Sequence, residues 1–212
     1  MEARHAAETM SEPFFESITT MDQASFADWV ESRPAHDDHH YELLNRRVVM
    51  MPPAGWPHGN VEGRLLRRMG NVAEPSGSGL VFGSSQGFEL PTGDTVEPDA
   101  SFVSMTRWRA AAPHVPGKFL RLVPDLVLEI LSQSTAVRDR GEKKAIYATA
   151  GVREYWLVDP RARTLTVFAL ELARFDAGRM LGEHEPWESH TLPGLSLCLA
   201  DLLFEAMLAR CL

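Results

Sequence analysis

Apolar and polar positions change in short runs along the 212-residue chain, and the pattern predicts strands and helices in succession. The most apolar stretch follows Pro124 and extends to Ser132, which is typical of a strand covered on both faces. Side chains alternate across a strand, so Asp125 and Glu129 would share one face. Because an unpaired buried carboxylate costs several kcal/mol, we expect a cation, a metal ion or a proton beside Glu129.

The rest of the pattern predicts an α/β fold in one domain at 20–212, preceded by a loose extension at 1–19. Thr20 and Gln23 fit a capping box for the first helix. Helices are expected at 20–30, 58–73, 139–150 and 200–210. Strands are expected at 46–51, 80–82, 87–90, 99–103, 125–132, 153–158 and 165–169, with a weaker strand or loop at 187–191. A long connection is expected at 104–119, and such connections often serve function.

Composition narrows the class of protein. The fractions of apolar and charged residues are ordinary for a globular protein, and no apolar run approaches the roughly 18 residues of a membrane span. The polar N-terminus lacks the apolar stretch of a secretory signal. The chain has only two cysteines, Cys198 and Cys211, which argues against a disulfide scaffold. We therefore expect a cytoplasmic protein without a membrane partner.

The net charge of −8 is concentrated at one end of the chain. Residues 1–45 carry ten Asp and Glu against two Lys and Arg, and residues 46–212 carry nineteen of each. The remainder of the chain is thus neutral and is free to present a basic face to phosphate groups.

Two acids and a lysine are the candidates for chemistry. Asp99 opens a predicted strand, Glu129 lies inside the central one, and Lys143 borders the inward stripe of the helix at 139–150. Carboxylates at strand ends suit Mg²⁺, and an inward lysine stabilises negative charge at a phosphate. Two structural alternatives stay open: a turn cap at Asp99 with a Glu129–lysine pair, and a surface pair between Asp139 and Lys143.

Further candidates are weaker. Glu42 precedes a strand and is a possible ligand or orienting base, or an exposed helix-end acid. His58 opens a helix, where it would contact a phosphate or cap the helix. Arginines that suit phosphate binding, or simply a solvated surface, are Arg64, Arg67, Arg107 and Arg109. The His and Asp cluster at 36–40 lacks the spacing of a metal site, so a solvated loop is favoured there.

An ordered set of short segments resembles one known family. The segments are Tyr41–Asn45, Pro52–Gly59, Pro98–Ala100, Pro124–Ser132, Lys143 with Tyr147, Gly151–Pro160 and Leu192–Leu195. Together they resemble the Uma-type family of bacterial restriction endonucleases, which is expanded in cyanobacteria and belongs to the PD-(D/E)XK nuclease superfamily. The likeness covers roughly residues 20–205, and its specificity comes from the order of the segments, since each piece alone is weak.

The resemblance implies a restriction-endonuclease-like mixed sheet flanked by helices, with Asp99 and Glu129 as metal ligands and Glu42 as an acid from the first core element. In the superfamily the lysine stands two residues after the second acid, where this chain has Leu131. Lys143 would reach the same space from the helix. Two departures from the family pattern are Arg46, where glycine is expected, and Gln133, where proline is common.

We therefore predict a DNA endonuclease dependent on Mg²⁺ or Mn²⁺, with DNA as its partner and a homodimer as its assembly, as in many such families. The competing prediction is a non-catalytic nucleic-acid-binding or protein-interaction module that keeps the nuclease fold. A third is a structural dimer whose arginines serve solubility.

Overall fold

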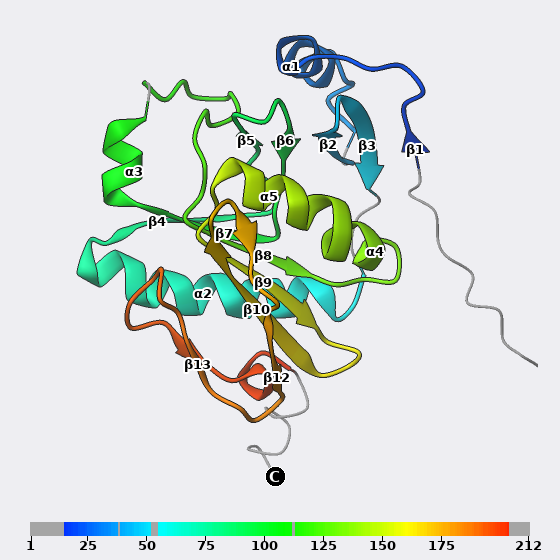
Figure 1. Cartoon of the computed structure of the whole chain (residues 1–212). Helices are drawn as coiled ribbons and strands as arrows, with labels where there is room; N and C mark the ends of the chain where they lie inside the picture. The colour runs from blue at the N-terminus through cyan, green and yellow to red at the C-terminus, as the bar shows by residue number, and fades with distance from the viewer. Residues whose placement is uncertain (1–14, 38, 52–54, 112, 204–212) are drawn as a thin grey trace, which may run out of the picture.

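The computed structural model describes residues 15–37, 39–51, 55–111 and 113–203 (Figure 1). Its helices are α1 (Gln23–Glu31), α2 (His58–Ser76), α3 (Met105–Ala110), α4 (Ala136–Arg138) and α5 (Lys144–Ala150). Its strands are β1 (Phe15–Glu16), β2 (His40–Leu44), β3 (Arg47–Met51), β4 (Gly79–Gly83), β5 (Phe88–Glu89), β6 (Thr95–Val96), β7 (Ala100–Ser104), β8 (Leu126–Ile130), β9 (Glu154–Asp159), β10 (Thr164–Glu171), β11 (Arg174–Phe175), β12 (Arg179–Gly182), β13 (Trp187–Glu188) and β14 (Ser196–Leu197). The predicted α/β class is confirmed.

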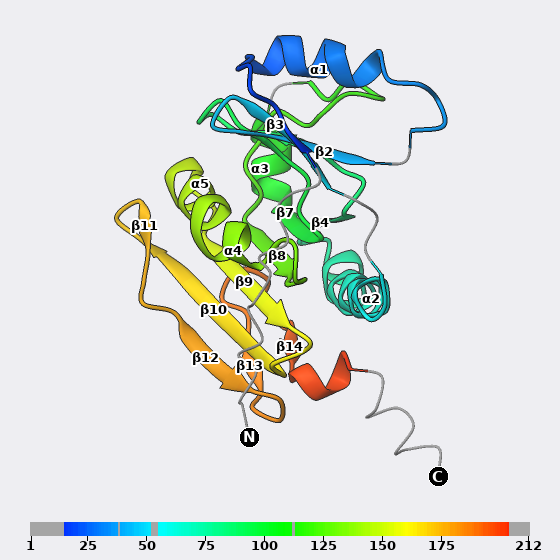
Figure 2. The same cartoon turned by 90° about the vertical axis from the view of Figure 1, so that its right-hand side faces the viewer.

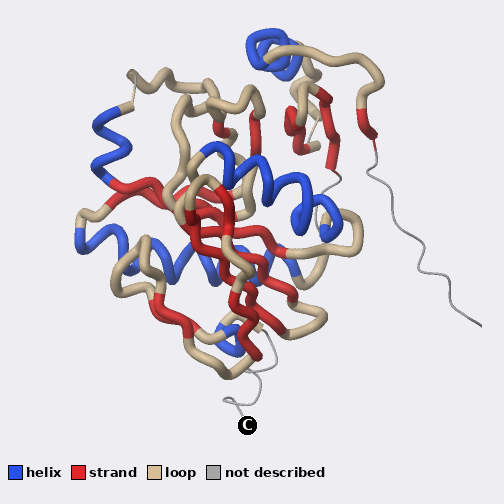
Figure 3. Tube along the Cα trace, viewed as in Figure 1, coloured by secondary structure: helices blue, strands red, loops and turns tan. Residues whose placement is uncertain are grey.

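The larger sheet has the strand order β11-β10-β9-β8-β7-β4, and β12 also pairs with β10. Strands β8 and β9 are parallel, whereas β7 pairs antiparallel with both β8 and β4. The sheet is therefore mixed, as predicted. The strands of this sheet lie at the centre of the molecule, and the helices lie around them (Figure 3).

Helices cover the two faces of this sheet (Figure 2). On one face, Leu126, Leu128 and Ile130 of β8 share a core with Leu65 and Met69 of α2. On the other face, Val127 packs in a core that includes Ile146 and Tyr147 of α5. The alternation predicted for the central strand is thus confirmed, and it places Glu129 on the α5 side of the sheet.

The smaller sheet has the order β1-β3-β2-β6-β5 and carries α1 on its outer side (Figure 2). Strand β1 pairs with β3, and Ser17 N donates to the carbonyl of Val48. The extension predicted to be loose at 1–19 therefore includes residues that belong to the sheet, while 1–14 lie outside the described residues. The N-cap of α1 is Asp22, which accepts from Ser25 N, and the predicted cap at Thr20 is wrong.

The hairpin that joins β2 to β3 turns at Asn45 and Arg46, whose φ angles are 49° and 68°. Asparagine tolerates this left-handed region, but a longer side chain is strained there. This explains why glycine fits the position of Arg46 in the family pattern.

Two helical regions differ from the sequence prediction. The connection at 104–119 contains α3, because Ser104 caps a short helix by accepting from Arg107 N. The helix predicted at 139–150 begins earlier, with α4, and is interrupted by a π-helical turn at Asp139–Lys143. By contrast, α2 begins at His58 as predicted and runs to Ser76, where Gly77 ends it with a φ of 60°.

The C-terminal region is described only in part. A 3-10 turn occupies Leu199–Asp201, and most of the helix predicted at 200–210 lies outside the described residues, as does Cys211. Cys198 is a free cysteine. Within the described part of the chain, none of the helices has the length and apolar character needed to cross a membrane.

Candidate active site

Lys143 joins two acids from different sheets. Its Nζ lies 2.6 Å from Glu129 Oε1 on β8 and 2.9 Å from Glu42 Oε1 on β2. All three residues are buried, with exposed fractions of 5% for Lys143, 3% for Glu129 and 4% for Glu42. Glu42 is therefore not an exposed helix-end acid. Its Oε1 also accepts from Glu97 N at 2.8 Å, which ties β2 to the segment that enters β7.

Asp99 lies at the head of β7, next to the end of β8. Its Oδ2 accepts from Ile130 N at 2.6 Å and lies 3.1 Å from His58 Nε2 at the start of α2. Asp99 thus does more than cap a turn, because it links a neighbouring strand to a helix. These bonds hold its carboxylate beside the residue that follows Glu129 on β8.

The π-helical turn brings two charged side chains inward. Asp139 and Lys143 are both buried, at 3% and 5% exposed, so the alternative of a surface pair is wrong. One turn further, Tyr147 donates its hydroxyl to Glu129 Oε1 at 2.6 Å. A π-turn widens a helix locally and is frequent at functional sites. Here it directs Lys143 towards Glu129 on β8 and Glu42 on β2.

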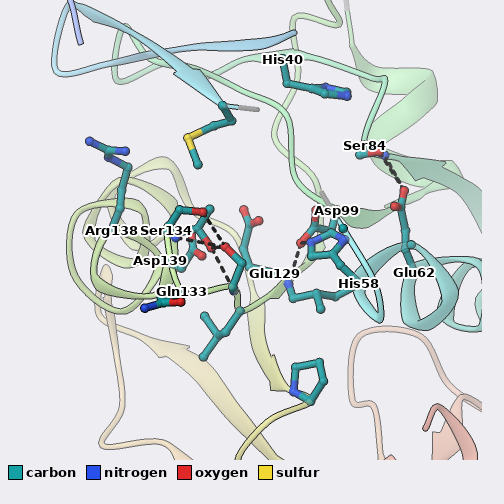
Figure 4. A pocket seen from close by; sticks show the side chains of 18 of the residues that line it. His40, His58, Glu62, Ser84, Asp99, Glu129, Gln133, Ser134, Arg138 and Asp139 are labelled. Carbon is teal, nitrogen blue, oxygen red and sulfur yellow. Dashed lines mark hydrogen bonds and ion pairs between the residues drawn. The ribbon is translucent and has the colours of Figure 1, made fainter. Parts of the chain in front are cut away.

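These groups border a cavity of about 550 Å³. Figure 4 shows Glu129 between Asp99 with His58 on one side and Asp139 with Ser134 and Arg138 on the other. The polar groups that line the cavity are His40, Glu42, His58, Glu62, Ser84, Glu97, Asp99, Glu129, Ser132, Gln133, Ser134, Thr135, Arg138, Asp139, Lys143 and Arg161.

Acids outnumber cations near the centre of this cavity, and the pKa values shift accordingly. Burial raises the pKa of Glu129 well above its ordinary value, and the nearby acids Asp139 and Asp99 add to the shift although Lys143 opposes it. Burial also raises the pKa of Asp139, to about 6. For Lys143, burial lowers the pKa, but its pairs with Glu129 and Glu42 outweigh burial and keep the ammonium charged.

The sequence did not single out several polar residues that line the cavity. His40 Nδ1 lies 2.8 Å from Glu97 Oε2, so the cluster at 36–40 is not merely a solvated loop. Asp139 faces the same space, and Glu62 accepts from the Ser84 hydroxyl at 2.8 Å. Strand alternation offered a signal for His40, since it stands two residues before Glu42 on β2. Glu97 and Asp99 have the same spacing, but they lie in the connection between β6 and β7, where strand alternation gives no signal.

The structure brings together five of the predicted residues, Glu42, His58, Asp99, Glu129 and Lys143, but not the arginines. Arg64 bonds to Asn60 and to the carbonyl of Asp201. Arg107 binds Asp125 and the carbonyls of Val123, Pro124 and Gly151, at the opposite end of β8. Arg67 and Arg109 are exposed outside the cavity. None of these four arginines lines the cavity, and their role in nucleic-acid binding stays a prediction.

Comparisons with known proteins agree with this fold. A solved structure titled as a putative nuclease belonging to DUF820 from Anabaena variabilis superposes with a TM-score of 0.67 at 16% identity, covering 83% of this chain and 96% of that chain. No curated protein matches the sequence. The model of one family, described as "Uma2: Putative restriction endonuclease", matches residues 25–200. The chain therefore belongs to the Uma2 family, which supports a nuclease function in general terms.

Proposed function

We propose that this protein is an endonuclease that hydrolyses DNA phosphodiester bonds with Mg²⁺ or Mn²⁺, using Asp99 and Glu129 as metal ligands and Lys143 to stabilise the attacking water or the phosphate. The observation that carries the proposal is the convergence of Lys143 on Glu129 at 2.6 Å, beside Asp99, in one cavity. The family supports nuclease chemistry, and the buried charges support its location.

The donor set suits a hard divalent cation. Asp99 and Glu129 offer carboxylate oxygens, and Mg²⁺ is often held by one or two carboxylates with water completing its shell. Among the described residues, no three His, Cys, Asp or Glu side chains form a ready-made metal site, so such an ion would depend on its waters. When bound, the ion would offset phosphate charge and lower the pKa of a water molecule.

The protein's own residues would prepare and stabilise the reaction. Lys143 supplies a fixed positive charge for the phosphate, and Glu42 holds its ammonium in place. Tyr147 and Lys143 both bind Oε1 of Glu129, which leaves Oε2 without these two contacts. His58 and the backbone N of Ile130 both contact Oδ2 of Asp99, and these two contacts orient its carboxylate. A preorganised site of this kind needs little rearrangement when substrate binds.

Cleavage of supercoiled plasmid tests the proposal. The wild-type protein is expected to cleave the plasmid in the presence of Mg²⁺ or Mn²⁺, and EDTA is expected to abolish this cleavage. Glu129→Ala should abolish cleavage, and Lys143→Met should lower the rate about 10²- to 10³-fold, the range seen when one charge-stabilising donor is lost. Lys144→Met is the matched control, because Lys144 lies over the Phe168 ring outside the cavity. Equal activity in Glu129→Ala and wild type would refute the assignment. DNA binding without any cleavage would favour the non-catalytic module.

A further inference from the structure

The groups that carry the proposed reaction are recessed. Glu42, Glu129 and Lys143 are each at most 5% exposed, at the inner wall of the cavity. A phosphate must therefore enter the cavity to reach them. A duplex is stiff and holds its bases stacked and paired, whereas a single strand bends easily. A single strand therefore enters such a recess with less distortion than a duplex does.

The cavity has room and an apolar surface for one nucleotide. Its volume of about 550 Å³ lies within the range of small-molecule sites. Apolar side chains occupy part of its wall, namely Met51, Trp56, Pro57, Ile130, Leu131 and Pro160. A flat apolar nucleobase fits such a wall better than a string of phosphates does, and the cavity's many acids would repel phosphates that no metal ion offsets.

Trp56 is the most distinctive member of this wall. Its side chain is 69% exposed, whereas Trp156 in the core is fully buried. A single exposed apolar residue is common and needs no explanation by itself. Trp56, however, lines the same cavity as the acids, and it immediately precedes Pro57 and His58 at the start of α2. An indole at that place offers a stacking surface for a base.

Arg161 supplies a cation on the same cavity. It lies in the turn between β9 and β10, where Asp159 accepts from its backbone N at 3.1 Å. The neighbouring Arg140 pairs with Asp159, and Arg163 pairs with Glu183. The exposed guanidinium of Arg161 forms no salt bridge with any described residue, so it is free to bind a phosphate.

We propose that the cavity takes an unpaired nucleotide, with its base stacked on Trp56 and an adjoining phosphate bound by Arg161, so that single-stranded DNA is preferred over duplex. This inference rests on the proposed function and specifies its substrate class. Sequence-independent stacking is typical of proteins that bind single strands, and loss of one stacking aromatic weakens binding by about 1–3 kcal/mol, which is about 5- to 150-fold.

Binding measured without turnover tests this inference. Fluorescence anisotropy would compare fluorescein-labelled single-stranded and duplex oligonucleotides, with Ca²⁺ in place of Mg²⁺ and a gel to show that the DNA stays intact. Trp56→Ala is expected to weaken single-strand binding about tenfold and duplex binding less than about twofold. Trp56→Phe should retain most of the affinity, and Arg161→Ala should weaken binding with a smaller salt dependence.

Matched controls separate stacking from general surface effects. Leu172→Ala removes a fully exposed apolar side chain, and Arg109→Ala an exposed arginine, both outside the cavity. Neither should change affinity. A single strand carrying 2-aminopurine should lose fluorescence on binding wild type but not Trp56→Ala. Thermal denaturation would show that Trp56→Ala is folded at the temperature of the binding measurements.

The outcomes are distinct. Unchanged single-strand affinity in Trp56→Ala, or an equal loss for single strand and duplex, would overturn the inference. If wild type cleaves DNA while Trp56→Ala binds like wild type, only this inference fails. If Trp56→Ala loses single-strand binding but wild type cleaves no DNA with either metal, the proposed function fails and the binding site stands.

Discussion

The central strand β8 has a buried carboxylate near each end, and the two ends differ in how the charge is handled. Asp125, fully buried, accepts from Ser104 N at 2.7 Å and pairs with Arg107 at 3.0 Å and Arg153 at 3.5 Å. Glu129 shares one lysine with Glu42 and lies among further acids on an open cavity. Asp125 does not line that cavity. A buried acid with surplus cations serves the fold, whereas buried acids with shifted pKa values on a cavity are typical of a functional site.

The largest expected effect concerns the Asp125 end. Asp125→Ala leaves Arg107 and Arg153 without their carboxylate and Ser104 N without its acceptor, so we expect unfolding free energy to fall by about 3–5 kcal/mol. Glu129→Gln should cost much less, because Lys143 keeps its pair with Glu42. Urea denaturation in EDTA measures both. A larger loss in Glu129→Gln than in Asp125→Ala would contradict the distinction between the two ends.

The second effect is the pH dependence of stability at the Glu129 end. The pKa of Asp139 rises from its ordinary 3.8 to about 6 on folding, so the folded protein holds this proton more tightly than the unfolded chain does. The contribution of the protonated carboxyl to the free energy of unfolding is therefore fully present below pH 3.8 and is lost as pH rises through 6. Asp139→Asn removes this loss. Its thermal midpoint, relative to wild type, should therefore be higher at pH 7.5 than at pH 4, by several degrees for about 2 kcal/mol.

The exposed Asp28 on α1 provides the control for this prediction, because Asp28→Asn changes the net charge equally but outside the cavity. Its difference from wild type should vary little with pH. A pH-independent difference for Asp139→Asn would show that the crowding of acids does not affect stability.

The third effect separates two buried tyrosines. Tyr147 donates to Glu129 Oε1 at 2.6 Å, whereas Tyr155 donates to the backbone carbonyl of Asp139 at 2.9 Å. Tyr147→Phe should weaken Mn²⁺ binding about 10- to 100-fold, the usual cost of losing a group that orients a metal ligand. Tyr155→Phe should leave it nearly unchanged. Calorimetric titration of the metal-free protein with Mn²⁺ measures this, and equal affinities would rule out an orienting role for Tyr147.

The sequence carried the framework of this site but not its details. Alternation in β8 predicted the face of Glu129, and the motif order predicted the lysine. Local patterns could not reveal that Arg107 binds back onto Asp125, because that contact depends on α3 and β8 meeting in space. They also could not reveal the π-turn, since the spacing of 139–150 fits a regular helix. His40 was missed because its neighbours in sequence, rather than its partner Glu97, suggested a loop.

The smallest expected effect tests whether the stability of the β2–β3 hairpin can change without a change in Mn²⁺ binding at the acids. Arg46 has a φ of 68° in the β2–β3 turn, where glycine avoids the strain of a side chain, so Arg46→Gly should stabilise the protein by about 1 kcal/mol. Arg47→Gly, one residue later in β3, should destabilise it, because glycine in a strand loses more entropy on folding and the pair with Glu16 is lost. Both positions lie outside the cavity, so Mn²⁺ affinity should be unchanged in each. If Arg46→Gly altered Mn²⁺ affinity as strongly as Tyr147→Phe, the hairpin that carries Glu42 would be coupled to the acids through its turn, and the Glu129 end could not be treated as a site independent of local stability.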